Sequence, residues 1–506
     1  MARFGYTIHW DCFDSQAEAE RLVRFALANG AGVLNVVPPP RIWEQPESLA
    51  TLRRIFRTAR RRGVTVMLNR IDGSSFAPPG RPRDNLLFGR ILTELGRLPD
   101  GSPTPDFFLA TVGNPAYQAW LEEETRYYAE HFSGEPALGG FSIGPFNEPF
   151  VSQRGSLLCW SPSTGSYEIG QYTPYLRDLW GEALRRRFDA GLAALNARFG
   201  TSFASFEEVP LPVNEHDPRF PRAAAAYWQL VSTVNQWVVD RYEACRSIWH
   251  AHARRRVPFV LQFSGYVPEK FEKGRLAFAA LDIFDWMARA DALGVSLYTN
   301  CEYPDWGHAS DAAMVNFLRL GKLLGKPVFV LEEGNECNGA ILDHGELGFL
   351  RDQARLLAPA TVIYEFLRST YYESSPQRSG RLLSPSWTEN APAVTAVSAA
   401  LREAATPGVP PRVVYVADDA PALATDPAAL QSRWKLMQAA LRMPIVFVPV
   451  RVLDAVPSGS TLVVLAPLSD GQTRRLQSRG VLVTNAGDVL GEPVGGAEGA
   501  GAPPRD

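Results

Sequence analysis

Short apolar runs alternate with longer amphipathic stretches through about the first four-fifths of the chain. This alternation is typical of βα units, in which a buried parallel strand is followed by a helix that packs on the sheet. Eight runs have the length and residue types of strands: 4–10, 32–38, 64–69, 140–144, 258–263, 292–298, 327–331 and 361–367. Eight such strands in order predict an α/β fold in the form of a closed (β/α)8 TIM barrel.

Helical spacing fills several of the intervals between these runs. The segment 15–29 ends at Gly30 and the segment 47–62 ends at Gly63, and glycine is the usual residue just after a helix. A further helix is predicted at 115–131. Between the fourth and fifth strands lies an insertion at about 152–222, with one helix around 175–199. Insertions after a barrel strand extend the face that carries the active site.

The prolines and glycine of the segment 406–411 predict a linker. We therefore expect a catalytic barrel over residues 1–405 and a smaller α/β domain over 412–490, flavodoxin-like or glutamine-amidotransferase-like, with an accessory or oligomer-forming role. Its predicted strands are 413–417, 445–448, 461–466 and 481–484, with a helix at 427–441. The tail 491–506, rich in glycine, alanine and proline, is expected to be disordered.

Composition narrows the function classes. The 506 residues are 46% hydrophobic and 21% charged, and the net charge is −3 with both signs interspersed. We expect no nucleic-acid partner, because the runs Arg60–Arg62 and Arg254–Arg256 end helical segments and are expected to be solvated last turns rather than a nucleic-acid-binding patch. The amino terminus lacks the pattern of a signal peptide, and no run of about 18 apolar residues could span a membrane, so a cytoplasmic protein without an anchor is expected. The five cysteines form no CxxC pair and the seven histidines no HExxH motif, so neither a metal site nor a cofactor is predicted.

Two of the predicted strands end in acids. The fourth runs into Asn147, Glu148 and Pro149, and the seventh into Glu332 and Glu333. A barrel brings the carboxyl ends of its strands to one catalytic face, and glycoside hydrolysis requires a pair of carboxyl groups there. Glu148 taken alone could instead cap the next helix. Strand alternation sends Glu332 and Glu333 to opposite sides, so the pattern leaves open which of the two is the nucleophile.

The arrangement resembles that of the clan A glycoside hydrolases, which are retaining enzymes with an acid/base glutamate after an asparagine at strand four. The segment 326–334 is similar to their seventh-strand pattern Lys-Pro-Val, three residues, Glu, one residue, Gly, and this likeness selects Glu332. The resemblance implies that Glu148 is the catalytic acid/base and Glu332 the nucleophile. It also implies that Asn147 binds the sugar 2-hydroxyl and that Tyr298 donates a hydrogen bond to Glu332. Tyr298 could equally be an aromatic residue of the rim without a catalytic partner.

A closer likeness is to glycoside hydrolase family 42, the β-galactosidase family. The segments 195–203 (LNARFGTSF) and 291–298 (DALGVSLY) look like two of its motifs, and the domain at 412–490 stands where that family has a trimerisation domain. The resemblance implies a β-galactosidase-like activity and a homo-oligomer, a trimer. Three features depart from the family: Phe199 replaces a tryptophan, Pro149 replaces a tyrosine, and the single Cys159 cannot form the cysteine metal cluster of some members.

Further residues near strand ends are candidates for carbohydrate binding. Trp10, Trp160 and Trp306 could offer flat faces to a sugar or could equally be core aromatics, and Arg70 could reach the pocket or form an ion pair. Two other functions stay open. The same chemistry could serve an endo-acting hydrolase of a β-linked polysaccharide or exopolysaccharide, or the barrel could bind carbohydrate without turnover.

Overall fold

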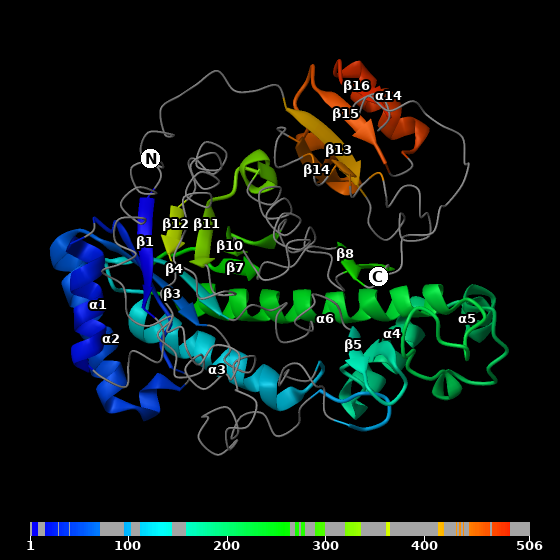
Figure 1. Ribbon diagram of the computed structural model, residues 1–506, viewed down its shortest axis with the longest axis horizontal. Coiled ribbons are helices and arrows are strands. Elements are labelled where there is room, and N and C mark those ends of the chain that lie inside the picture. The colour runs from blue at the N-terminus through cyan, green and yellow to red at the C-terminus, as the bar shows by residue number, and fades with distance from the viewer. Residues whose placement is uncertain are drawn as a thin grey trace, which may run out of the picture. The chain divides into compact units, whose positions relative to one another are not determined.

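The computed structural model describes the greater part of the chain (Figure 1). The described residues are 3–8, 16–28, 30–39, 41–70, 96–102, 112–143, 158–263, 269–272, 275–278, 289–298, 319–334, 361–364, 413–418, 445–465 and 468–485, with isolated positions between 432 and 439. The chain folds into two compact units, Met1–Gly408 and Val409–Asp506.

The first unit contains the predicted (β/α)8 barrel. Its eight strands are β1 (Arg3–Ile8), β2 (Val33–Val36), β3 (Thr65–Arg70), β4 (Leu138–Ile143), β7 (Val260–Phe263), β10 (Ala292–Tyr298), β11 (Val328–Gly334) and β12 (Thr361–Tyr364). All pairs are parallel, in the order β4-β3-β2-β1-β12-β11-β10-β7. A parallel bridge between Phe141 and Phe259, with a 3.0 Å bond from Phe141 N to Pro258 O, joins the two ends and closes the barrel. The eight predicted strands are confirmed to within a few residues.

Helices cover the outside of the barrel (Figure 1). They include α1 (Gln16–Ala28), α2 (Pro46–Arg62) after the short 3-10 turn η2 (Ile42–Glu44), α3 (Pro115–Phe132) and the 30-residue α6 (Ala223–His252). Helix α2 ends at Gly63, whose φ of 68° is the left-handed conformation that glycine adopts at little cost. In the described part of the chain, no helix is both long enough and apolar enough to cross a membrane.

An aromatic layer joins α3 and α6 to the barrel. The ring of Phe141 on β4 stacks on Trp249 of α6 at 4.4 Å between centroids, and it lies 5.5 Å from Tyr128 of α3 and 5.8 Å from Phe259. Phe141, Trp249 and Tyr128 are fully buried. Phe141 therefore faces outward from the barrel, toward the helices, and this fixes the direction of its neighbours along β4.

The insertion after β4 begins with an antiparallel hairpin, β5 (Leu158–Ser161) and β6 (Ser166–Ile169), and continues with α4 (Pro174–Arg187), α5 (Leu192–Phe199) and the turn η7 (Phe206–Glu208). The prediction of one helix at 175–199 was wrong. Gly191 has a φ of 104°, a conformation that helices do not contain, and it separates α4 from α5. A second hairpin, β8 (Glu269–Glu272) with β9 (Arg275–Phe278), follows β7 and was not predicted.

The second unit contains a four-stranded parallel sheet in the order β14-β13-β15-β16. Its strands are β13 (Val414–Asp418), β14 (Ile445–Pro449), β15 (Thr461–Val464) and β16 (Leu482–Thr484), joined in part by the turn η8 (Val450–Ala455) and the helix α14 (Asp470–Ser478). Helix α14 begins with a capping box between Ser469 and Gln472. The four strands were predicted; most of the predicted helix 427–441 and the tail 491–506 lie outside the described residues, and the flavodoxin-like or amidotransferase-like class stays a prediction.

Candidate active site

The barrel interior is apolar near the amino-terminal ends of the strands. Val33, Met67, Val260 and Ala292 form one buried cluster, with Phe329 packed against it. These residues belong to five strands, and β3 and β7 are not neighbours in the sheet. Side chains from all five strands can meet only inside the barrel, around its axis. These residues therefore occupy inward-facing positions on their strands.

The inward phase of β3 and β4 follows from this cluster. A Cβ added to Gly140 would meet Met67 Cε and Val260 Cγ2, so Gly140 also faces the axis. Side chains alternate along a strand, and the positions in phase with Met67 and Gly140 are therefore Asn69 and Ser142. The outward direction of Phe141 agrees with this phase.

Above the apolar level, toward the carboxyl ends of the strands, the interior becomes polar. Asn69 and Ser142 are each only 1% exposed, and they are register partners on β3 and β4. On the neighbouring strands Asn35 Nδ2 donates a 3.0 Å hydrogen bond to Thr7 Oγ1. Burying a polar group without a partner costs about 1–3 kcal/mol, so a polar level inside a barrel needs a physical explanation. Sequence reasoning missed this level, although an inward Asn35 within Val-Leu-Asn-Val signals it.

The register of β11 is irregular where the predicted nucleophile lies. Phe329 and Val330 pair with Gly294 and Val295 of β10, but the next pair is Glu332 with Ser296. Strand β11 thus contains one extra residue, Leu331, which is a β-bulge. Ser296 is in phase with Ala292, whose side chain faces the axis, so the backbone position of Glu332 is an inward register position.

The position of Glu333 has the opposite phase. It pairs with Leu297 on β10 and with Tyr364 on β12, and its register is shifted by the same extra residue on that side. In the pairing of β11 with β10 and with β12, the bulge therefore gives the positions of the two adjacent acids opposite phases. Without it, a regular alternation from the inward Phe329 would have put position 333, and not 332, in the inward phase.

The remaining predicted site residues are described in part or not at all. Arg70 and Tyr298 end β3 and β10, so their backbones lie at the same carboxyl-end rim as that of Glu332, and Tyr298 pairs with Gly334. The side chains of these three residues lie outside the described part, as do Asn147, Glu148, Trp10 and Trp306 entirely. The roles predicted for them stay predictions. Within the described part, no three His, Cys, Asp or Glu side chains are grouped as metal ligands would be.

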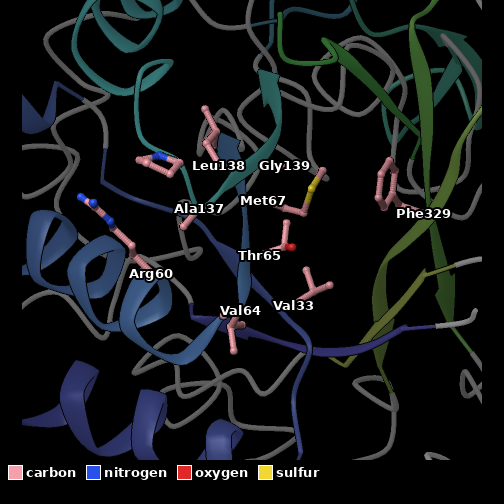
Figure 2. A pocket seen from close by; sticks show the side chains of 11 residues that line it. Val33, Arg60, Val64, Thr65, Met67, Ala137, Leu138, Gly139 and Phe329 are labelled. Carbon is pink, nitrogen blue, oxygen red and sulfur yellow. The ribbon is translucent and has the colours of Figure 1, made fainter. Parts of the chain in front are cut away.

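A pocket of about 520 Å³ opens at the opposite, amino-terminal end of the barrel (Figure 2). Its lining combines Val33, Met67 and Phe329 with Arg60, Gly63, Val64, Thr65 and the segment Pro136–Gly139, which precede or begin strands. In barrel enzymes this face serves stability and the carboxyl-end face serves catalysis. The pocket is therefore not the candidate active site.

One of the two family-like motifs has a structural role. Asp291, just before β10, accepts hydrogen bonds from Arg246 Nε at 2.9 Å and Phe259 N at 3.0 Å, and lies 2.7 Å from His250 Nε2. Burial alone would raise the pKa of Asp291, but these hydrogen bonds and the charge of Arg246 outweigh it and hold the pKa below its ordinary value. This carboxylate ties α6 to β7 and β10 at the amino-terminal end of the barrel.

The other motif, at 195–203, closes the end of α5. Asn196 Oδ1 accepts from Thr201 Oγ1 at 2.8 Å and from Phe203 N at 3.0 Å, and Asn196 Nδ2 donates to Phe203 O at 2.9 Å. Gly200 caps the helix with a φ of 73°. Phe199 is fully buried against Trp180, Phe188 and Phe220. The motif therefore shapes the insertion, and the aromatic character of position 199 is what its packing requires.

Several solved structures of glycoside hydrolases have a similar fold. A β-galactosidase from the haloarchaeon Halorubrum lacusprofundi superposes with a TM-score of 0.63 at 17% identity, covering 95% of this chain and 72% of that one. A family 42 β-galactosidase from G. stearothermophilus gives 0.62 at 12% identity, covering 94% and 69%. A family 5 enzyme from Streptomyces cattleya, solved with GlcNAc, gives 0.51 at 12%, covering 96% and 99%.

The chain shares the (β/α)8 barrel fold of these glycoside hydrolases. No family model and no curated protein matches it. The likeness therefore holds at the level of the fold, and it agrees with the resemblance to family 42 inferred from the segments 195–203 and 291–298.

Proposed function

We propose that the protein is a retaining glycoside hydrolase that cleaves a β-linked glycoside, with Glu332 as nucleophile and Glu148 as acid/base. The observation that carries the proposal is the inward register position of Glu332 at the carboxyl-end rim of a barrel shared with glycosidases. Glu148 follows β4, the strand that runs into the same rim. Glycoside hydrolysis requires a pair of carboxyl groups, and this rim can supply both.

The reaction would proceed in two displacements. The Glu332 carboxylate attacks the anomeric carbon while the bond to the leaving oxygen breaks and Glu148 gives its proton to that oxygen. Water then attacks the glycosyl-enzyme ester, returns a proton to Glu148 and frees Glu332. This sequence requires the two carboxyl groups to stand about 5–5.5 Å apart.

The choice of glycoside rests on the structural neighbours. Several of them are named β-galactosidases, and an aryl β-galactoside is therefore the first substrate to test. The panel includes the corresponding glucoside, mannoside and xyloside, together with β-glucan polymers. Release of oligosaccharides from a polymer would instead assign an endo-acting hydrolase.

The decisive experiment is covalent trapping. A 2-deoxy-2-fluoro aryl β-glycoside of the preferred sugar should inactivate the enzyme and leave a glycosyl group on Glu332, found by fragmentation of the peptide that contains Glu332 and Glu333. Proton NMR of the first product should show the β-anomer. Labelling of Glu333, an α-anomer as first product, or binding of sugar without turnover by the whole panel would each refute the proposal.

A further inference from the structure

The polar level of the barrel interior consists of two pairs on adjacent strands. Thr7 and Asn35, on β1 and β2, are joined by their own hydrogen bond of 3.0 Å. Asn69 and Ser142, on β3 and β4, are register partners with the same inward phase, and neighbouring strands are about 4.8 Å apart. The second pair is thus within reach of one small group placed between them.

The first pair is joined by a hydrogen bond between its own side chains, and the second pair has no such bond. Among the described residues, no hydrogen-bonding group reaches Asn69 Oδ1 or Ser142 Oγ, although both side chains are 1% exposed. Buried polar atoms in folded proteins nearly always have a partner, so each exception needs an explanation, such as a bound water molecule or a functional group that the site receives. Stability alone does not explain why β3 and β4 carry these two residues.

The chemistry of the pair selects the kind of group. Asn69 Oδ1 can only accept a hydrogen bond, whereas the Ser142 hydroxyl can both donate and accept. A hydroxyl group has the same dual capacity and can donate to Asn69 while it accepts from Ser142. An anion would be repelled by the amide oxygen, and a cation would find two neutral ligands and no carboxylate in this described level.

We propose that Asn69 and Ser142 bind one hydroxyl of the sugar in the catalytic subsite and thereby determine which sugar the enzyme accepts. The inference rests on the proposed glycosidase function. Ser142 lies on the strand that runs into Asn147 and Glu148, and Asn69 precedes Arg70 at the end of β3. The pair therefore lies in the barrel interior just below the carboxyl ends of β3 and β4, and in this proposal it binds the ring hydroxyl that enters deepest.

The experiment compares Ser142→Ala and Asn69→Leu with the wild type on monodeoxy analogues of whichever aryl β-glycoside the wild type hydrolyses fastest. Each variant should lower kcat/KM on the parent glycoside by about 10-fold or more, the effect of one lost hydrogen bond. On the single analogue that lacks the bound hydroxyl, variant and wild type should agree to within about twofold, because the interaction is already absent. On the other analogues the loss should persist.

Thermal unfolding provides a second readout. Ser142→Ala removes a hydroxyl without a described partner, so its melting temperature should equal or exceed that of the wild type. The matched control is Thr125→Val on α3, whose hydroxyl donates to Leu121 O at 2.7 Å outside the barrel. It should melt at a lower temperature and keep its kcat/KM unchanged on every substrate.

The outcomes separate this inference from the function on which it rests. An unchanged kcat/KM of Ser142→Ala and Asn69→Leu on the parent, or an equal loss on every deoxy analogue, would overturn the assignment of the pair and leave the glycosidase intact. A lower melting temperature of Ser142→Ala with an equal loss on all substrates would show a structural role only. Absence of turnover and of trapping in the wild type would remove the proposed function itself.

Discussion

Glu332 is in register with Ser296, although counting onward from the pair Phe329 and Gly294 would match Ser296 with Leu331. The extra residue in β11 gives the position of Glu332 the inward phase and that of Glu333 the outward phase. Bulges are frequent next to active sites, where they redirect a side chain. In this strand the bulge gives the backbone positions of the two adjacent acids opposite register phases.

The first prediction follows from this phase. Glu332→Gln should lower kcat on an aryl β-glycoside by at least about 10⁴-fold, the order seen when an enzymatic nucleophile is removed. Glu333→Gln is the matched control, with the same chemical change one residue further along the chain, and should keep kcat within about 10-fold of the wild type. Steady-state kinetics of both variants check the prediction, and the reverse ranking would contradict it.

The second prediction concerns proton donation by Glu148. Glu148→Ala should lose about 10²–10⁴-fold in kcat/KM on substrates with poor leaving groups, which need protonation. Dinitrophenyl glycosides, whose leaving group departs as an anion, should be affected far less, and added azide should restore turnover by attacking the glycosyl-enzyme. An equal loss on all leaving groups would assign Glu148 to a structural role.

Most of the fold, but only part of the site, could be predicted from the sequence. Apolar runs located all eight barrel strands, and Gly63 located the end of α2, because burial and the left-handed conformation each leave a local signal. The break at Gly191 was missed although a glycine inside a helical pattern is itself a local signal, whereas the bulge at Leu331 depends on pairing between strands and leaves no local pattern. The likeness to a family motif selected Glu332; the inward register position of residue 332 is compatible with that choice, which stays a prediction.

The third prediction concerns pH and stability. The folded pKa of Asp291 is held below its ordinary value, so its contribution is complete above that ordinary value of about 3.9 and is lost as the pH falls through the folded pKa. Asp291→Asn should lower the free energy of unfolding by about 1.5–3 kcal/mol at pH 7, the range for hydrogen bonds to a charged group. At pH 3 and below, the difference from the wild type should shrink.

Urea unfolding of both proteins at several pH values measures this difference. The control is Glu207→Gln, which breaks an exposed pair with Arg185 at 2.7 Å and should change stability little at any pH. A difference between Asp291→Asn and the wild type that is constant from pH 7 to pH 2.5 would mean that the ionised carboxylate of Asp291 is not what stabilises the fold.

The fourth prediction tests the packing of the barrel near the amino-terminal pocket. Gly139 is the extra residue of β4 opposite the step from Val66 to Met67, and a Cβ added there would collide with Thr65 Cγ2. Gly139→Ala should therefore destabilise the protein by about 1–3 kcal/mol through overpacking. Thr65→Ser removes that same methyl group, so the double variant should recover most of the loss.

Urea unfolding of the four proteins gives the coupling energy, which we expect to be favourable by about 1 kcal/mol or more because the two residues touch. Additive effects would show that the collision is relieved by movement of the strand and that Gly139 is not required by the side chain of Thr65.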